Sequence, residues 1–183
     1  MKLRDNLELN RSGNRRTLHE ISLDNNEPMT DCQRIVLSFD LIKRHYLNHI
    51  GLSEELAKSV DALFQIENNK SDDGIYMVEF KNGDIQNRDI ERKVRDSLLI
   101  FNSITNSQID YSRGNLHFVL VYNSDNHSFN FQSKKAIEMA NRARTEFDVF
   151  GLKGLRNCYF KSVRAYNKKE FRNNIERYIE NIT

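Results

Sequence analysis

Residues 59–67 (SVDALFQIE) and 75–81 (IYMVEFK) decide the fold, because each has the pattern of a β-strand. Apolar side chains recur at every second position in both stretches, as in a strand that packs one face on a core. Residues 68–74 (NNKSDDG) separate them and are rich in the Asn, Asp, Ser and Gly that favour turns. The sequence therefore predicts an antiparallel β-hairpin over residues 59–81.

The two-residue period also predicts which side chains share a face of this hairpin. Asp61, Glu79 and Lys81 point to one face. The opposite, apolar face is formed by Val60, Ala62, Phe64, Ile66, Tyr76, Val78 and Phe80. If Glu67 faces Ile75, Asp61 stands opposite Lys81 at about 5 Å and diagonal to Glu79 at about 7 Å. Two carboxylates and one amine then converge on one face.

The rest of the chain alternates predicted helices and strands, as in an α/β domain. Residues 30–33 (TDCQ) have the form of a capping box ahead of apolar residues at helical spacing, and Gly51 suits the position after that helix. Residues 115–122 (NLHFVLVY) are almost continuously apolar, which predicts a strand covered on both faces. The other expected elements are an edge strand within 18–23, helices over 87–103, 133–147 and 168–182, and a last strand or hairpin pair within 155–166. The expected architecture is a central mixed sheet of four or more strands flanked by helices.

Length and composition indicate one domain. The chain has 183 residues, enough for one hydrophobic core, with 38% hydrophobic and 30% charged residues. We expect a polar N-terminal segment (1–29), a core (30–125) and a basic part that completes the domain (126–183). No apolar run approaches about 20 residues and no apolar signal region is visible, so we expect no membrane partner and a cytoplasmic location. Cys32 and Cys158 have no metal-ligand spacing and are expected to be reduced thiols.

The predicted cluster on the hairpin fits the chemistry of phosphodiester hydrolysis. Mg²⁺ and Mn²⁺ take oxygen ligands, which Asp61, Glu79 and the backbone carbonyl of Phe80 can supply. Such a metal polarises a phosphoryl oxygen and lowers the pKa of a bound water. Lys81 can orient or deprotonate that water, or stabilise the charge that develops on the phosphate. The triplet Glu79-Phe80-Lys81 alone is weak evidence in a chain with 26 acidic residues, so the argument depends on Asp61 sharing its face.

Asp61 followed by Glu79-Phe80-Lys81, in consecutive strands after a helix, resembles the motif of the PD-(D/E)XK nuclease superfamily. The resemblance covers roughly residues 31–125, and Val60 stands where the motif usually has Pro. It implies a restriction-endonuclease-like αβββαβ core, a nuclease that cleaves DNA or RNA, and Mg²⁺ or Mn²⁺ as cofactor. Because small nucleases of this type often act as homodimers, it also implies a second copy as partner, although the sequence shows no interface.

The resemblance further implies two kinds of supporting residue. The superfamily often adds an acidic metal ligand from the first helix, for which Glu55 or Glu54 is expected here and Asp40 less so. It also often adds a polar residue on the helix after the lysine strand. Lys93 is the expected catalytic helper, with Arg88 and Arg92 as its alternatives.

The C-terminal third has the charge expected of a nucleic-acid contact. Residues 130–183 carry 12 Lys and Arg against 6 Asp and Glu, whereas residues 1–129 carry 16 against 20. Aromatic and basic residues alternate within 157–172 (NCYFKSVRAYNKKEFR), which suits a groove that follows a phosphate backbone. The expected nucleic-acid-binding residues are Lys161, Arg164, Lys168 and Lys169.

Other interpretations remain open at this point. The acidic and lysine side chains could form a solvent-facing, salt-bridged strand. The protein could be a non-catalytic nucleic-acid- or protein-binding regulator on a degenerate nuclease fold, for instance in phage or bacterial conflict, or bind nucleic acid without cutting it. His45 and His49 have zinc-ligand spacing on a helix but lack an adjacent Glu and a third ligand, and His117 is expected in the core. No glycine-rich phosphate loop is present, so P-loop nucleotide hydrolysis is not supported.

Overall fold

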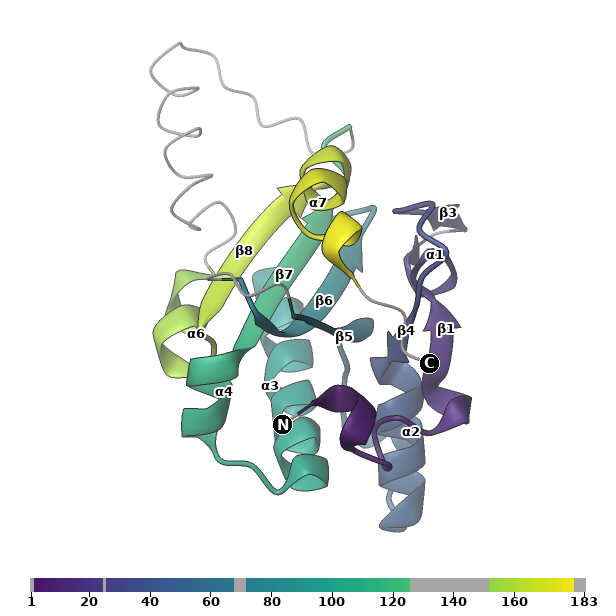
Figure 1. The fold of residues 1–183 in the computed structure, drawn as a ribbon, viewed down its shortest axis with the longest axis vertical. Coiled ribbons are helices and arrows are strands. Elements are labelled where there is room, and N and C mark those ends of the chain that lie inside the picture. The colour runs from purple at the N-terminus through teal and green to yellow at the C-terminus, as the bar shows by residue number, and fades with distance from the viewer. Residues whose placement is uncertain (1, 25, 68–71, 126–151, 180–183) are drawn as a thin grey trace.

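Strand β6 (Gly74–Lys81) lies inside a six-stranded mixed sheet with the order β1-β4-β5-β6-β7-β8 (Figure 1). The computed structural model describes residues 2–24, 26–67, 72–125 and 152–179. The first four strands are antiparallel: β1 (Arg15–Thr17), β4 (Ile35–Ser38), β5 (Ala62–Ile66) and β6. The last two, β7 (Leu116–Tyr122) and β8 (Ser162–Asn167), run parallel to β6. The predicted α/β architecture with a central mixed sheet is confirmed.

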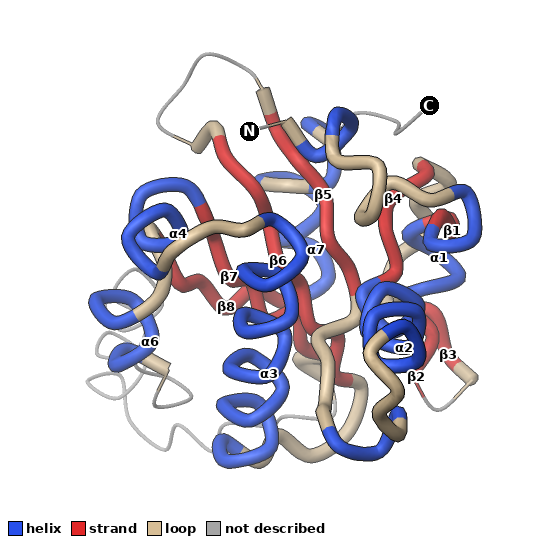
Figure 2. The backbone as a smooth tube through the Cα atoms, turned by 90° about the horizontal axis from the view of Figure 1, so that it is seen from below, coloured by secondary structure: helices blue, strands red, loops and turns tan. Residues whose placement is uncertain are grey.

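Helices cover both faces of this sheet (Figures 1 and 2). One face carries α2 (Phe39–His49), α3 (Asn87–Thr105), α4 (Ile109–Asn115) and α6 (Lys153–Cys158). The other carries α1 (Leu18–Ile21) and α7 (Lys168–Asn174), the latter followed by the 3-10 turn η4 (Glu176–Tyr178). A small second sheet pairs β2 (Leu23–Asp24) with β3 (Glu27–Pro28). Because β7 is sandwiched between the layers, all of its residues are buried, as predicted.

Within β5 and β6 the hairpin has the predicted faces but a different register. Gln65, not Glu67, faces Ile75, and the paired residues end at Ala62 and Val78. The Asp61 N–H also donates to the Val78 carbonyl, so Asp61 lies just before the regular ladder and is not opposite Lys81. The two registers differ by two residues, and a slip of two leaves every side chain on its own face. The observed register pairs Phe64 with Tyr76, whose rings stack with centroids 5.6 Å apart.

Both faces of the hairpin are buried in hydrophobic cores. The apolar set predicted from the two-residue period packs with α1 and α7, except for Val60, which belongs to the core on the opposite side. That opposite side also buries Leu63, Ile75 and Met77 beneath the α2–α3 layer. The face that carries Asp61 and Glu79 is therefore not the solvent-facing strand of the alternative interpretation.

Several predicted element boundaries are wrong. Residues 35–38 form a strand between β1 and β5, and α2 begins only at Phe39, because a short apolar run satisfies helical and strand periodicity equally well. Thr30 is not an N-cap; its hydroxyl donates to Glu176. Residues 18–21 are a helical turn capped by Thr17 and Glu20, not an edge strand.

The C-terminal expectations are met in part. The chain between β7 and β8 ends in helix α6, so the only strand observed within 155–166 is β8, which extends to Asn167. The closing helix is shorter than predicted and ends at Asn174. Helix α3 and strand β7 match their predictions, and the helix expected over 133–147 lies outside the described residues.

The motif's resemblance predicts a helix followed by three strands. In the structure this helix, α2, instead follows the first of these strands, β4. Strands β4, β5 and β6 are antiparallel neighbours, α3 then leads to the parallel strand β7, and α2 connects β4 to β5. Among the described residues, no helix combines the length and the apolar character needed to cross a membrane.

His117 of β7 is a core histidine, as predicted. It is 1% exposed, and its ring stacks on Tyr76 with centroids 4.5 Å apart. Nε2 lies 3.3 Å from the carbonyl oxygen of Asp73, which can only accept, so Nε2 carries the proton and Nδ1 accepts from the Ser162 hydroxyl at 2.6 Å. Burial lowers the pKa of His117 to about 4.

We predict that His117 makes the fold less stable as pH falls from 6.5 towards 4. In this window the unfolded chain binds a proton that the buried imidazole refuses, so protonation favours unfolding, by up to about 3 kcal/mol. In urea denaturation at pH 7, His117→Gln should have a lower free energy of unfolding than the wild type. At pH 4.5 the difference between the two free energies should be smaller, because the wild type has lost the contribution of the neutral imidazole. His49→Gln, at the exposed end of α2, is the matched control. A difference that stays constant between the two pH values would contradict the prediction.

Candidate active site

The candidate site forms where β5, β6, α2 and α3 meet. Asp61 immediately precedes β5, Glu79 and Lys81 lie on β6, and Lys93 lies on α3. The Asp61 backbone N–H donates to Val78 (3.0 Å), and the Asp61 carbonyl accepts from the Phe39 N–H (2.9 Å). These bonds connect the start of β5 to β6 and to the start of α2. These hydrogen bonds hold the backbone of Asp61 in place independently of its side-chain contacts.

One ammonium group bridges the two carboxylates. Lys93 Nζ lies 2.7 Å from Glu79 Oε1 and 3.9 Å from Asp61 Oδ1. Lys81 Nζ lies 3.2 Å from the same Glu79 oxygen. Asp61 Oδ2 accepts a hydrogen bond from the Phe80 N–H at 2.6 Å. The carboxylates of Asp61 and Glu79 are therefore within reach of a single cation.

Burial makes this cluster electrostatically unusual. Glu79 is 0% exposed, and the side chains of Asp61 and Lys93 are each 18% exposed. Burial raises the pKa of Asp61 well above its ordinary value, and the charge of Glu79 raises it further. Burial also raises the pKa of Glu79, against the opposing effect of Lys93 and Lys81. Both carboxyl groups thus resist ionisation, and an additional cation would favour their charged forms.

Lys93 responds in the opposite direction. Burial alone would lower the pKa of its ammonium, but the charges of Glu79 and Asp61 outweigh burial and raise it. Lys93 therefore stays protonated and serves as the internal counter-ion of the two acids. The side chain of Lys81, at the end of β6, is 21% exposed, close to the 18% of Lys93.

Glu79 has one oxygen with no partner. Its Oε1 accepts from two lysines, whereas Oε2 is buried without a hydrogen bond, the one such side-chain atom found in the described part of the chain. A buried carboxylate oxygen without a partner costs stability, and such atoms in native structures often mark a site for an ion or a proton.

Asp40 of α2 is the further acid whose charge acts on the cluster, where the sequence predicted Glu54 or Glu55. Its charge raises the pKa of both Asp61 and Lys93, but its side chain is 60% exposed, pairs with Lys43 at 3.9 Å and accepts from the Ser59 hydroxyl. Glu54 instead pairs with Arg44 at 3.0 Å, and Glu55 is exposed on η3 (Glu54–Leu56). The interactions found among the described residues connect neither glutamate to the cluster.

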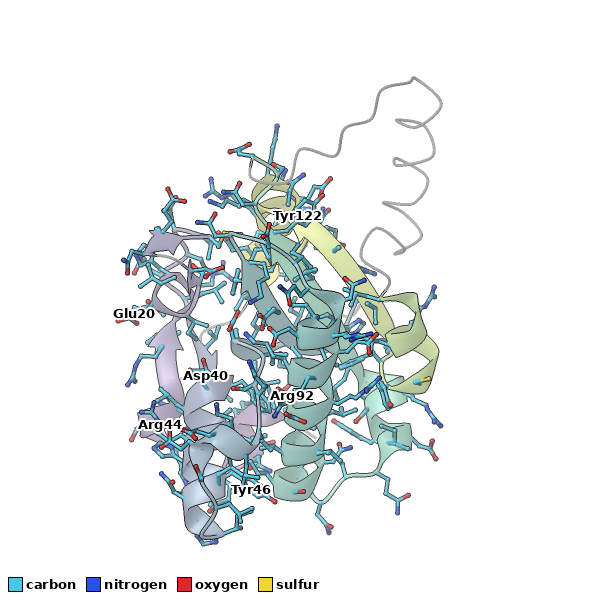
Figure 3. All side chains as sticks on the ribbon, turned by 180° about the vertical axis from the view of Figure 1, so that it is seen from behind. Glu20, Asp40, Arg44, Tyr46, Arg92 and Tyr122 are labelled. Carbon is cyan, nitrogen blue, oxygen red and sulfur yellow. The ribbon has the colours of Figure 1, made fainter. Side chains whose placement is uncertain are left out.

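The difference between the predicted and the observed start of this helix changes the position of Asp40. A helix that begins at residue 30 puts Asp40 in its middle, whereas α2 begins at Phe39 and puts Asp40 in its first turn. The bond between the Phe39 N–H and the Asp61 carbonyl then brings that turn to β5. In Figure 3, Asp40 is labelled where α2 begins, on the same side of the sheet as α3.

On α3, Lys93 is the basic residue that reaches the cluster, and Arg88 and Arg92 are not. Lys93 lies beside the buried residues Ile90 and Val94, so the packing of α3 turns it towards the sheet. Arg92 is mostly exposed and pairs with Asp96 at 3.7 Å, and Arg88 is exposed.

The site offers fewer metal ligands than a closed metal centre. No group of three His, Cys, Asp or Glu residues in the described ranges is arranged to hold a metal ion. His45 has zinc-ligand spacing with His49, but its Nδ1 lies 2.7 Å from the side-chain oxygen of Asn14. Comparison of the chain with family models, with curated proteins and with solved structures finds no match in any of the three.

We predict that Lys93→Met lowers the free energy of unfolding by roughly 3 kcal/mol, because it leaves Glu79 and Asp61 without their bridging counter-ion. Adding Glu79→Gln should recover part of this loss, since the double variant leaves only Asp61 without its counter-ion. Urea denaturation at pH 7 of both single variants and the double variant measures the coupling. Lys58→Met, which breaks the more exposed pair with Asp89, should cost less than about 1 kcal/mol. Equal losses for Lys93→Met and Lys58→Met would show that Lys93 is not the counter-ion.

Proposed function

We propose that this protein is a divalent-metal-dependent nuclease whose catalytic residues are Asp61, Glu79 and Lys81, with Lys93 positioning the two carboxylates. The observation that carries the proposal is the buried Glu79 carboxylate, with one unpartnered oxygen, beside a second carboxylate of raised pKa. A metal ion would satisfy the unpartnered oxygen and favour the charged form of both acids. The expected substrate is the phosphodiester backbone of DNA or RNA.

The residues present fit a hard cation. Mg²⁺ and Mn²⁺ bind through one or two carboxylates together with waters and substrate phosphate, so a full set of protein ligands is not required. Asp61 and Glu79 would hold the ion, with waters and substrate phosphate completing its coordination. The Phe80 carbonyl is a further candidate, because N–H and C=O of one strand residue point to the same side and its N–H already meets Asp61. When bound, the ion supplies Lewis-acid polarisation of the phosphate and a water of lowered pKa.

The two lysines would have separate roles. Lys81 lies at the end of β6 and contacts Glu79 at the longer distance of 3.2 Å, so its ammonium can turn to the substrate phosphate, orient the attacking water and stabilise developing negative charge. Lys93 is a positioning residue, because it holds the carboxylates of Glu79 and Asp61 close together.

The arrangement of strands is compatible with the superfamily that the motif resembles. Three antiparallel strands, a crossover helix and a parallel strand (β4, β5, β6, α3, β7) correspond to the βββαβ part of the expected αβββαβ core. Helix α2 departs from that order by lying between the first two strands. Membership in the PD-(D/E)XK superfamily, a cytoplasmic location and a homodimer remain parts of the proposal.

A non-catalytic role is the second candidate, and one observation favours it. Two carboxylates, Asp61 and Glu79, face two ammonium groups, Lys81 and Lys93, so the cluster is balanced in charge without a metal. A buried ion-pair network of this kind can specify a fold and nothing more. The two candidates differ in metal binding and in cleavage.

We predict that Mg²⁺ or Mn²⁺ stabilises the wild-type protein. A metal concentration about 100 times the dissociation constant adds about 2.7 kcal/mol, which is several degrees in Tm for a chain of this size. Thermal unfolding with and without metal measures the shift. Asp61→Asn and Glu79→Gln should abolish it, whereas Glu54→Gln, which removes an acid outside the cluster, should keep it. A wild-type Tm that no divalent metal changes would favour the structural candidate.

We predict metal-dependent cleavage of supercoiled plasmid or of single-stranded RNA by the purified protein. Lys81→Ala should lower the rate by roughly 100-fold or more, because general acid–base and charge stabilisation contribute at least this much. Asp61→Asn and Glu79→Gln should be equally inactive, and Lys2→Ala, whose partner is Glu67 at the far end of β5, is the control. Cleavage that survives both Lys81→Ala and Glu79→Gln would reject the proposed site.

A further inference from the structure

An open groove lies between helix α7 and residues 28–31, two segments that are more than one hundred residues apart in the sequence. Its lining combines the start of α7 with the segment that follows β3. The lining residues are Pro28, Met29, Thr30, Asp31, Lys168, Lys169, Arg172 and Asn173.

Specific contacts fix the two walls of this groove. Arg172 on α7 pairs with Asp31 at 3.2 Å, and the Thr30 hydroxyl donates to Glu176 beyond α7. Met29 and Phe171 are both buried in the core on this side of the sheet. The groove therefore exists before any ligand binds, which lowers the cost of binding.

The lining is positively charged. Lys168, Lys169 and Arg172 face a single acid, Asp31, within the lining. The neighbouring Glu170 directs its carboxylate to the backbone of Asn167, at 3.0 Å, and so caps α7 instead of opposing the lysines. A ligand with several negative charges in a row suits a groove of this composition.

The groove lies at the same sheet edge as Lys81. Strands β6, β7 and β8 are parallel, and Lys81, Tyr122 and Asn167 stand at the same level in them. Neighbouring strands are about 4.8 Å apart, so the backbones of Lys81 and Lys168 are separated by roughly 10 Å at this edge. In open α/β sheets, ligands commonly bind outside the carboxyl ends of parallel strands.

The other two residues expected to bind nucleic acid lie at the opposite end of the parallel strands. Arg164 pairs with Asp72 at 2.7 Å, and Lys161 donates to the carbonyl of Asp73 at 3.0 Å. Both partners lie at the amino-terminal end of β6, the end opposite Lys81. The fold thus separates Lys161 and Arg164, at the amino-terminal end of β6, from Lys168 and Lys169, which line the groove.

We propose that the groove between α7 and residues 28–31 binds the phosphate backbone of a nucleic acid, with Lys168, Lys169 and Arg172 as the contacts. This inference rests on the proposed function, because it places the strand to be cut at the carboxyl edge where Lys81 lies. Arg172 contributes a forked guanidinium that can bind phosphate, and the two lysines contribute point charges.

The test is binding of a fluorescently labelled oligonucleotide by anisotropy, with EDTA present so that no metal-dependent cleavage occurs. Single-stranded DNA, single-stranded RNA and duplex DNA are compared at several salt concentrations. We expect Lys168→Ala/Lys169→Ala to weaken binding about tenfold or more and to reduce the slope of log K against log salt by one to two units. Arg172→Gln should weaken binding in the same direction.

The matched control is Arg44→Ala/Arg95→Ala, which removes the same charge from exposed positions outside the groove. It should change the affinity less than threefold, and both double variants should melt close to the wild type. Equal losses in the two double variants, or no binding of any oligonucleotide by the wild type, would overturn the groove. Groove-dependent binding without cleavage in any metal would uphold the groove and reject the nuclease, so the two proposals fail separately.

Discussion

The contact between Glu79 and Lys93 connects the central strand of the sheet to the helix that covers it. Lys93 Nζ lies 2.7 Å from a carboxylate that has no exposed surface. A charge in such a position requires a partner, because burying it alone would cost several kcal/mol. Lys93 meets this requirement, and the same ammonium also reaches the Asp61 carboxylate at 3.9 Å.

The same contact explains why a polar cluster can exist within a hydrophobic layer. The face of β6 beneath α2 and α3 buries Ile75 and Met77 before it reaches Glu79. The apolar contacts hold α3 against the sheet, and the ion pair sets where along the helix a basic residue must stand. Lys93 meets that requirement and Arg92, one residue earlier, points to solvent. The arrangement leaves one oxygen of Glu79 unsatisfied, which is the feature that distinguishes a candidate catalytic site from a balanced ion pair.

Catalytic and binding residues, in our proposals, share the carboxyl edge of the parallel strands. Lys81 ends β6 on the α3 side, and Lys168 follows β8 on the α7 side. The Phe171 side chain packs edge-on against Phe80, with ring centroids 5.7 Å apart, and so connects the groove helix to the residue between Glu79 and Lys81. A strand of nucleic acid that lies in the groove would pass the edge at which Lys81 ends.

The sequence by itself determined the hairpin, the two faces of β5 and β6, and the shared face of Glu79 and Lys81, because a two-residue period assigns faces without knowledge of any partner. It also determined α3 and β7, whose patterns are long and regular. Tertiary structure alone decided that residues 35–38 form a strand, because pairing with β1 and β5 selects between two periodicities that a short apolar run satisfies equally. It decided, too, the register that pairs Gln65 with Ile75, the pairing of Glu54 with Arg44 away from the cluster, and the separation of Lys168 from Lys161. Each of these depends on contacts between segments far apart in the chain, which no local pattern specifies.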